Sequence, residues 1–193
     1  MAAADSQLMP FELTICGIEE LACCCAAGVT DVLSILDPGS PEPPDLNTFA
    51  VDRRLKLRFH DIIEPHPGWT APEYWDIDLL LAFGRNLASR ETHLLVHCHA
   101  GISRSTAAAT LVMAQAQPDR PADEVLQQVA RLRPRAWPNL RILELGDEIL
   151  DRRGEIVRAA HLHYRRALER EPWLAEAMID GGRGREVAAA RRV

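Results

Sequence analysis

The chain has 193 residues, of which 47% are hydrophobic, and this fits a single domain with a substantial core. Its formal net charge of −6 argues against nucleic acid as the main partner, because phosphate backbones bind basic protein surfaces. No run approaches the roughly 18 apolar residues of a membrane span, and residues 1–6 lack the basic and apolar regions of a secretory signal.

The cysteines favour a reducing compartment. Three of the five are adjacent, which is neither a disulfide framework nor the spacing of a zinc knuckle. His97, Cys98 and His99 would alternate sides on a strand and would not converge on one ion. We therefore expect a cytoplasmic protein without metal or cofactor, and leave open whether the other cysteines take part in redox regulation of Cys98. The five are Cys16, Cys23, Cys24, Cys25 and Cys98.

The first part of the chain predicts two strands with a helix between them. Residues 11–16 alternate between apolar and polar side chains, which indicates a strand. Residues 18–27 predict a helix that Gly28 caps. Residues 29–36 predict a second, buried strand, which is followed by a proline-rich loop over 38–44.

The middle of the chain predicts a third strand, a loop and a capped helix. Apolar and basic side chains alternate over 55–59, which indicates a strand. A loop follows at 65–69. Thr70 and Glu73 have the spacing of a capping box, so we expect the next helix to begin there and to end near Ala88.

A fourth strand is predicted over 94–97, directly before a glycine-bearing loop. The small residues after that loop predict a helix that ends near Ala116. Two further helices are expected, one over 121–132, which Pro134 stops, and one over 139–152.

Strands that alternate with helices indicate a largely parallel sheet covered on both faces. We expect an α/β single domain over 11–153, with a central, mostly parallel sheet of four to five strands flanked by helices. Residues 154–180 are expected to form a C-terminal helical extension, which begins with a charged amphipathic helix over 155–170. Residues 181–193 are polar, basic and contain glycine, and are expected to form a flexible tail. Ligands of such sheets bind at the carboxyl ends of strands, where Cys98 falls.

The loop from Cys98 to Ser105 has the residue types of a phosphate-binding site. A loop that turns into a helix N-terminus points several backbone N–H groups at one spot, and these donors favour an anion. They favour the thiolate form of Cys98 for the same reason. Arg104 adds a planar fork that binds two phosphate oxygens at once. Gly101 lets the backbone turn closely around the ligand.

His97 and Cys98, followed by five residues, Arg104 and Ser105, resemble the signature of the cysteine-dependent protein tyrosine phosphatases. The form Ala-Gly-x-Ser-Arg-Ser is similar to the dual-specificity branch and its small bacterial relatives, and the resemblance covers roughly residues 12–152. It implies Cys98 as nucleophile, Arg104 as phosphate ligand and Ser105 as a hydroxyl that helps the thiolate leave. It implies a structural His97, hydrogen-bonded near the cysteine backbone. The residues implied to line the phosphate pocket are His99, Ala100, Gly101, Ile102 and Ser103.

Phosphoryl transfer from an alcohol or phenol needs a proton for the leaving oxygen, which a positioned carboxylic acid supplies. The resemblance implies an aspartate on a loop after an earlier strand, and Asp61 fits, 37 residues before Cys98. Asp76 and Asp78 are rivals inside the predicted helix, and Glu64 is a weaker substitute on the same loop. Asp61 is alternatively an Asx turn that closes the strand.

Residues 133–139 resemble the dual-specificity segment that ends in Pro-Asn and packs against the phosphate loop. Asn139 is also a good N-cap for its own helix, so both roles coexist. Trp69 has two open interpretations: a wall at the mouth of the pocket, or a cover for the core.

The resemblance implies hydrolysis of protein phosphotyrosine, with phosphoserine and phosphothreonine as further candidates, through a phosphocysteine intermediate. A phosphoinositide or inositol phosphate phosphatase is an alternative, which the absence of lysine from the loop disfavours. A non-catalytic module that captures phosphorylated partners is another, and retention of Cys98 and Arg104 argues against it. A sulfur-transfer or arsenate-reducing enzyme is disfavoured by Ser105 and the upstream acid. The physiological substrate and the oligomeric state are not predicted.

Overall fold

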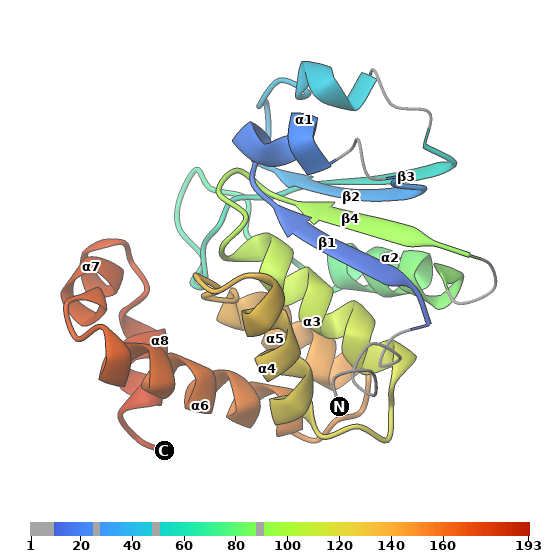
Figure 1. Cartoon of the computed structure of the whole chain (residues 1–193). Helices are drawn as coiled ribbons and strands as arrows, with labels where there is room; N and C mark the ends of the chain where they lie inside the picture. Colours follow the sequence, from blue (N-terminus) through green and yellow to red (C-terminus); the bar gives the residue numbers. More distant parts are fainter. Residues whose placement is uncertain (1–9, 25–27, 48–50, 88–90) are drawn as a thin grey trace.

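The structure, a computed structural model, contains a parallel sheet of four strands in the order β1-β4-β2-β3 (Figure 1). Every residue of β2 and β4 is buried, as expected for the two central strands of a sheet covered on both faces. The predicted α/β fold is thereby confirmed. The residues described are 10–24, 28–47, 51–87 and 91–193. The strands are β1 (Glu12–Cys16), β2 (Asp31–Leu36), β3 (Arg53–Arg58) and β4 (His93–His97).

Helices cover the two faces of the sheet unequally. The short helix α1 lies on one face, and α2 to α5 lie on the other with α6 beyond them (Figure 1). Successive residues of a central strand serve the two faces: Leu95 faces the α1 side, and Leu94 and Val96 face the larger core. Within the described residues, no helix is long and apolar enough to cross a membrane. The helices are α1 (Leu21–Cys24), α2 (Tyr74–Arg85), α3 (Arg104–Ala116), α4 (Ala122–Leu132), α5 (Leu140–Ile149), α6 (Glu155–Arg170), α7 (Leu174–Asp180) and α8 (Gly184–Ala190), with 3-10 turns η1 (Ile18–Glu20) and η3 (Pro44–Asn47).

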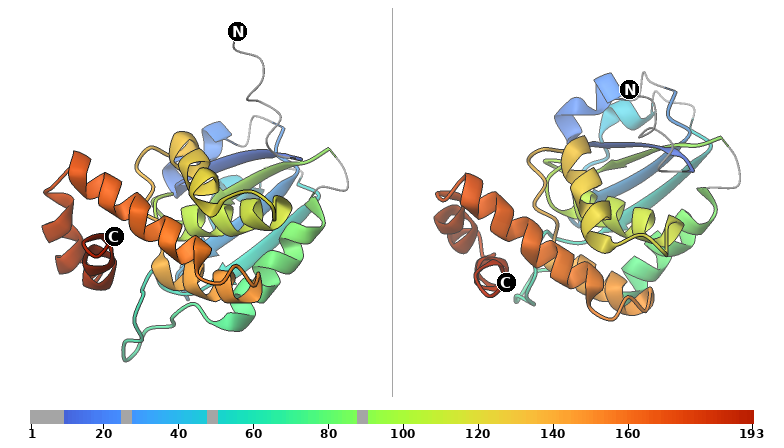
Figure 2. Two further views of the ribbon diagram at one scale, coloured as in Figure 1. Left: turned by 90° about the horizontal axis from the view of Figure 1, so that it is seen from below. Right: turned by 60° about the horizontal axis from the view of Figure 1, so that its bottom comes forward.

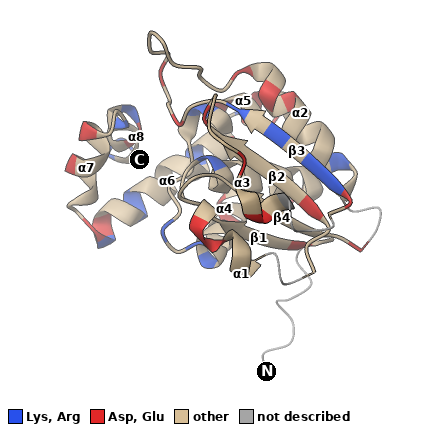
Figure 3. Ribbon diagram, turned by 90° about the horizontal axis from the view of Figure 1, so that it is seen from above, with Lys and Arg blue, Asp and Glu red and all other residues tan. Residues whose placement is uncertain are grey.

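The edge strand β3 is strongly basic along its length (Figure 3). Arg53 Nε lies 2.7 Å from Asp31 Oδ1 of the neighbouring strand, and Lys56 Nζ lies 3.1 Å from Glu42 Oε2. Charged side chains on an edge strand discourage pairing with another chain, so this edge is protected against aggregation.

The start of α2 differs from the sequence prediction. The N-cap is Glu73, and its backbone N–H donates to Asp76 Oδ2 at 2.9 Å. Thr70 lies before the helix, where its carbonyl oxygen accepts from the backbone N–H of His60 at 2.7 Å. The predicted capping box of Thr70 and Glu73 is therefore wrong, because Thr70 is used to close the preceding loop. The predicted helix end near Ala88 lies outside the described residues.

The helix predicted over 18–27 is shorter and begins with a 3-10 turn. It consists of η1 followed by α1, which ends at Cys24. Residues 25–27, and with them Cys25, lie outside the described residues. Gly28 has a φ of +76°, the left-handed conformation that its predicted capping role requires.

The segment predicted to be a flexible tail instead contains helix α8. It packs beside α6 together with α7, and the three helices form a lobe at one side of the sheet (Figures 1 and 2). Val187 and Ala190 of α8 are buried in the same hydrophobic core as Ile156 and Tyr164 of α6. The composition of this segment is polar, but its few apolar residues lie on one helical face and are covered by α6. This burial explains why the segment is helical rather than a flexible tail.

Candidate active site

The parallel sheet brings the ends of separate strands to one edge. Cys98 follows β4 directly, and α3 begins at Arg104 after a tight loop. Asp37 follows β2, and Asp61 lies shortly after β3. The predicted nucleophile and the predicted acid therefore come from different strands and meet at the same edge.

The loop after Cys98 is shaped by Gly101. This residue has a φ of +70°, and a Cβ on it would lie 2.5 Å from the Cys16 carbonyl carbon and 2.6 Å from the Gly17 nitrogen. Both atoms are backbone and cannot move aside easily. Only glycine fits this position, so the loop is pressed against the end of β1 and its shape is fixed by that contact.

The Cys98 thiol lies at the base of the loop. Its Sγ is 3.2 Å from Ser105 Oγ, and Cys98 is 3% exposed. Ser105 stands in the first turn of α3, whose N-terminus faces the loop. The hydroxyl is thus placed to donate to a thiolate, and the helix N-terminus favours negative charge at the same spot.

Arg104 is held through both of its terminal nitrogens. Nη1 donates to Asp37 Oδ1 at 2.6 Å and to the Phe59 carbonyl oxygen at 2.7 Å, while Nη2 donates to His99 Nδ1 at 3.0 Å. In the part of the chain that the structure describes, the buried Nε finds no acceptor. A buried donor without an acceptor is costly, and an anion at the Nε–Nη2 edge would satisfy it.

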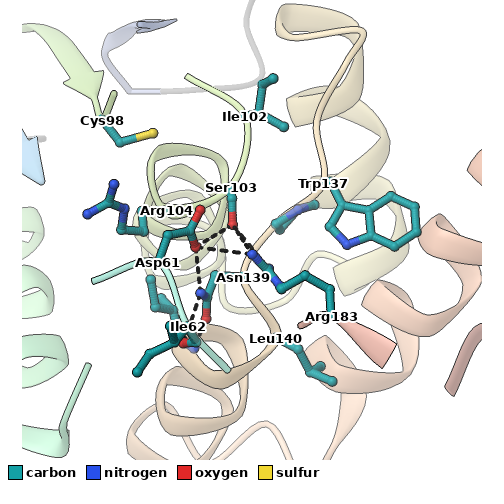
Figure 4. A network of polar contacts seen from close by, with 12 residues as sticks. Asp61, Ile62, Cys98, Ile102, Ser103, Arg104, Trp137, Asn139, Leu140 and Arg183 are labelled. Carbon is teal, nitrogen blue, oxygen red and sulfur yellow. Dashed lines mark hydrogen bonds and ion pairs between the residues drawn. The ribbon is translucent and has the colours of Figure 1, made fainter. Parts of the chain in front are cut away.

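Asp61 is hydrogen-bonded to the Cys98–Ser105 loop and its surroundings (Figure 4). Its Oδ1 accepts from Ser103 Oγ at 2.8 Å, from Asn139 Nδ2 at 2.8 Å and from Arg183 Nη1 at 3.2 Å. Two of these donors, Ser103 and Asn139, are among the predicted site residues. The structure therefore brings the predicted acid, the loop and Asn139 together.

The rival acids are placed elsewhere. Asp76 is buried at the start of α2, where burial raises the pKa of its carboxyl. Asp78 is exposed on the same helix. Glu64 Oε1 lies 2.5 Å from Arg185 Nε and is committed to that ion pair. None of the three has a hydrogen bond to the described part of the Cys98 loop.

His97 is fully buried and bonds across the sheet. Its Nε2 and Ser34 Oγ of β2 are hydrogen-bond partners. Burial lowers the pKa of His97 to about 4, so the ring is neutral at neutral pH. The ring beside Cys98 therefore adds no positive charge there, and its hydrogen bond to Ser34 ties it to β2.

The segment 133–139 packs against the loop, as the resemblance implies. The Trp137 backbone N–H donates to the Ile102 carbonyl oxygen at 2.9 Å, and the Asn139 N–H donates to the Ser103 carbonyl oxygen at 3.3 Å. Arg133 supports the loop from outside, with Nε 3.0 Å from the Gly101 carbonyl oxygen. Asn139 also caps α5 through its side-chain oxygen, so both roles predicted for it are present.

One cavity borders the Asp61 loop, and another borders the Cys98 loop. One of about 270 Å³ lies between the Asp61 loop and residues 181–183, with Trp69 in its wall. Another of about 670 Å³ is lined by the exposed side of the Cys98 loop and by Arg133 and Arg135. Trp69 is 52% exposed and packs on His60, so it does not cover the core.

Three site residues were missed by the sequence reasoning. Asp37 could have been found, because it follows a predicted strand just as Asp61 does, and parallel strands end at the same edge. Arg183 and Glu186 fall in the segment predicted to be a tail, and nothing in its composition signals that both are buried or that Arg183 contacts Asp61.

No protein-family model and no curated protein matches the chain. Solved structures do match. Human DUSP28 superposes with a TM-score of 0.55 and 17% identity, over 72% of this chain and 92% of that one. The human tyrosine phosphatase-like serine/threonine/tyrosine-interacting protein gives 0.56 and 19%, over 74% and 93%. PTPMT1 in complex with PI(5)P gives 0.53 and 14%, over 73% and 91%.

These likenesses concern the fold. The chain has the dual-specificity phosphatase fold, which confirms at the level of architecture the resemblance carried by the Cys98–Ser105 loop. The matched region includes at least 91% of each of these three chains but no more than 74% of this one. About a quarter of the chain is therefore additional to the shared fold.

Proposed function

We propose that the protein is a cysteine-dependent phosphatase that hydrolyses phosphotyrosine on proteins, with phosphoserine and phosphothreonine as further candidate substrates. The supporting observation is the 2.8 Å hydrogen bond from Ser103 Oγ to Asp61 Oδ1, which joins the candidate acid to the loop of the candidate nucleophile. A structural Asx turn would not need that long-range partner. The bond therefore favours a shared catalytic role for the two loops.

The first step transfers the phosphoryl group to Cys98. The thiolate attacks phosphorus in line, the S–P bond forms and the bond from phosphorus to the leaving oxygen breaks. Asp61 donates its proton to that oxygen, so the product leaves as a neutral alcohol or phenol. Arg104 and the loop N–H groups stabilise the equatorial oxygens while charge shifts among them.

The second step releases phosphate. Water attacks phosphorus, the Asp61 carboxylate takes the proton of the water, and the S–P bond breaks. The Ser105 hydroxyl, 3.2 Å from Sγ, stabilises the departing thiolate. Nη1 of Arg104 already donates to two oxygens and Nη2 to His99 Nδ1, whereas Nε has no acceptor among the described residues, so phosphate would bind at the Nε–Nη2 edge.

The two alternatives each have a relative in structure. PTPMT1 was solved with PI(5)P bound, which favours an inositol lipid as the second candidate substrate class. The phosphatase-like interacting protein favours a module that binds without turnover. Retention of Cys98, Arg104 and Asp61 argues against such a module, because binding without turnover does not need a nucleophile and an acid. Turnover of a substrate would distinguish the two.

The test is turnover of a phosphotyrosine peptide, a phosphoserine peptide and an inositol lipid, side by side. We expect the phosphotyrosine peptide to have the highest kcat/KM and Cys98→Ser to abolish turnover of all three while the thermal unfolding curve stays close to that of the unchanged protein. Preference for the lipid would replace the proposed substrate class. Substantial residual activity in folded Cys98→Ser would contradict the phosphocysteine mechanism.

A further inference from the structure

Arg183, between α7 and α8, reaches into the candidate active site from the C-terminal segment (Figure 4). Its Nη1 lies 3.2 Å from Asp61 Oδ1, and its Nη1 and Nη2 lie 3.2 Å and 3.1 Å from Ser103 Oγ. Arg183 is only 7% exposed. One guanidinium therefore bridges the acid loop and the phosphate loop, from a position 122 residues after Asp61 in the sequence.

The bridge is fixed by Glu186, which is fully buried. Glu186 accepts from Arg183 Nε at 3.0 Å and Nη2 at 2.7 Å. It also accepts from Trp137 Nε1 at 2.5 Å and from the Leu140 backbone N–H at 3.0 Å, at the start of α5. A buried ion pair whose remaining lone pairs are satisfied in this way holds its geometry firmly. Arg183 is therefore an ordered part of the site rather than a mobile surface residue.

The bridge leaves Asp61 with one engaged oxygen and one open oxygen. Oδ1 accepts from Ser103, Asn139 and Arg183, whereas Oδ2 has no hydrogen bond to the residues that the structure describes. In Figure 4, the oxygen without dashed lines points away from Arg183, on the side where Cys98 and Arg104 are drawn. The open oxygen is the one that can carry the catalytic proton.

We propose that Arg183 is a positioning residue for the general acid, so that the C-terminal segment completes the active site of the phosphatase fold. By holding Oδ1 against Ser103, it presents Oδ2 to the leaving oxygen. This inference rests on the proposed function of Asp61 as the acid.

The test variant is Arg183→Gln combined with Glu186→Gln, because Arg183→Gln alone would leave a buried carboxylate without its partner. A general acid matters most for a poor leaving group. We expect the rate for a phosphotyrosine peptide to fall about 10-fold or more, within the roughly 100- to 10,000-fold that a general acid contributes, while an aryl phosphate with an acidic phenol slows far less. Arg192→Gln, which removes a charge from an exposed residue beyond α8, is the matched control and is expected to change neither rate.

A double-mutant cycle with Asp61→Asn separates positioning from general structure. If Arg183 acts through the acid, adding the paired substitution to Asp61→Asn causes no further loss. Equal slowing of both substrates, or an undiminished loss on top of Asp61→Asn, would overturn the proposal. A different result, Asp61→Asn that slows both substrates equally, would count against Asp61 as the acid and thus against the proposed function itself.

Thermal unfolding shows whether the paired variant is folded at the assay temperature. If it is not, Arg183→Lys replaces it, because lysine keeps the charge next to Glu186 but cannot bridge Asp61 and Ser103 with a planar fork. The same selective loss for the phosphotyrosine peptide is expected. Wild-type rates on both substrates in Arg183→Lys would contradict the bridging role.

Discussion

The role proposed for Asp61 requires a single carboxyl group to be both anchored and reactive. One oxygen is committed to three donors, and the proposed chemistry needs only the other. Such an anchor limits rotation of the carboxyl group, so the proton is held in one place rather than shared between two oxygens. The same network makes a conservative substitution informative, because an amide at this position can keep the shape of the side chain but not its acidity.

Asp61→Asn is expected to slow a phosphotyrosine peptide by about 100-fold or more, and an ester of an acidic phenol much less, since only the poor leaving group needs the proton. It should also remove the fall in rate on the alkaline side of the pH–rate profile, which would report loss of that proton. The measurement is a pH–rate profile with both substrates, with Asp78→Asn on the exposed face of α2 as the control. An unchanged alkaline limb would make Asp61 a structural residue.

For individual residues, the sequence was most informative where the residues of the candidate site are neighbours in the chain. Cys98, Arg104 and Ser105 are close in sequence and therefore close in space once a loop and helix form. Asp61 was chosen as the candidate acid because the resembled family has an aspartate on a loop after an earlier strand, and Asp61 follows such a strand. Arg183 could not be found in this way, since its contact with Asp61 depends on how α6 and α8 fold back, and no local pattern reports that.

Among the elements, β4 links the core to the site. Its last residue, His97, bonds to Ser34 on β2 and precedes Cys98. The strand is buried along its whole length, so the position of Cys98 is set by the centre of the sheet rather than by a mobile edge. A change inside this strand is therefore expected to affect stability before it affects substrate contacts.

His97 predicts a pH dependence of stability. Burial lowers its folded pKa from 6.5 to about 4, so between these values the unfolded chain binds a proton that the folded chain does not. The free energy of unfolding should thus fall as pH falls from about 6.5 to 4, by up to about 3 kcal/mol from this residue. Above about pH 6.5 this contribution is constant.

The measurement is denaturant unfolding at several pH values for the unchanged protein and for His97→Gln. Burial also lowers the pKa of His161 and His163, so the difference in slope between the two proteins is the quantity attributable to His97. His163→Gln serves as a buried-histidine control. Equal slopes for the unchanged protein and His97→Gln would show that His97 is protonated alike in both states.

Helices and strands with a clear local pattern of residue types, or with a residue that ends them, were predicted well. Those that depend on contacts with distant residues were not. The helix after the Cys98 loop and the helix at 155–170 match α3 and α6, because small, helix-prone residues define the first and an amphipathic pattern defines the second. The cap of α2 was misassigned because Thr70 bonds to His60, ten residues earlier. Helix α8 was missed because its order comes from burial against α6.

At the scale of the whole molecule, the C-terminal helices share a core with the phosphatase fold. Tyr164 of α6 is fully buried, stacks on Trp137 with ring centroids 4.8 Å apart, and donates to the Pro138 carbonyl oxygen. The stacking and the hydrogen bond both fall on the segment that supports the Cys98 loop. The hydrophobic core therefore continues across the expected boundary at residue 153, and residues on both sides of it pack together.

A shared core predicts one cooperative unfolding transition for the entire chain. We expect far-UV circular dichroism, tryptophan fluorescence and loss of phosphatase activity to give the same denaturant midpoint. Tyr164→Phe, which leaves the Pro138 carbonyl without its donor, should lower the free energy of unfolding by about 1–3 kcal/mol and shift all three curves together. An early transition seen only by circular dichroism would instead mean that α6 to α8 unfold on their own.

The contact between Arg183 and Ser103 spans 80 residues of sequence, and this has a consequence for the newly made protein. Ribosomes add about 5–20 residues per second, so Arg183 is made roughly 4–16 s after the loop that carries Cys98. During that interval the proposed nucleophile Cys98, Arg104 and Asp61 all exist, but the guanidinium that contacts Asp61 does not. In the proposed mechanism, a nascent chain would thus possess its loop well before Arg183 could position the acid, so full turnover would have to wait until Arg183 is synthesised and packed.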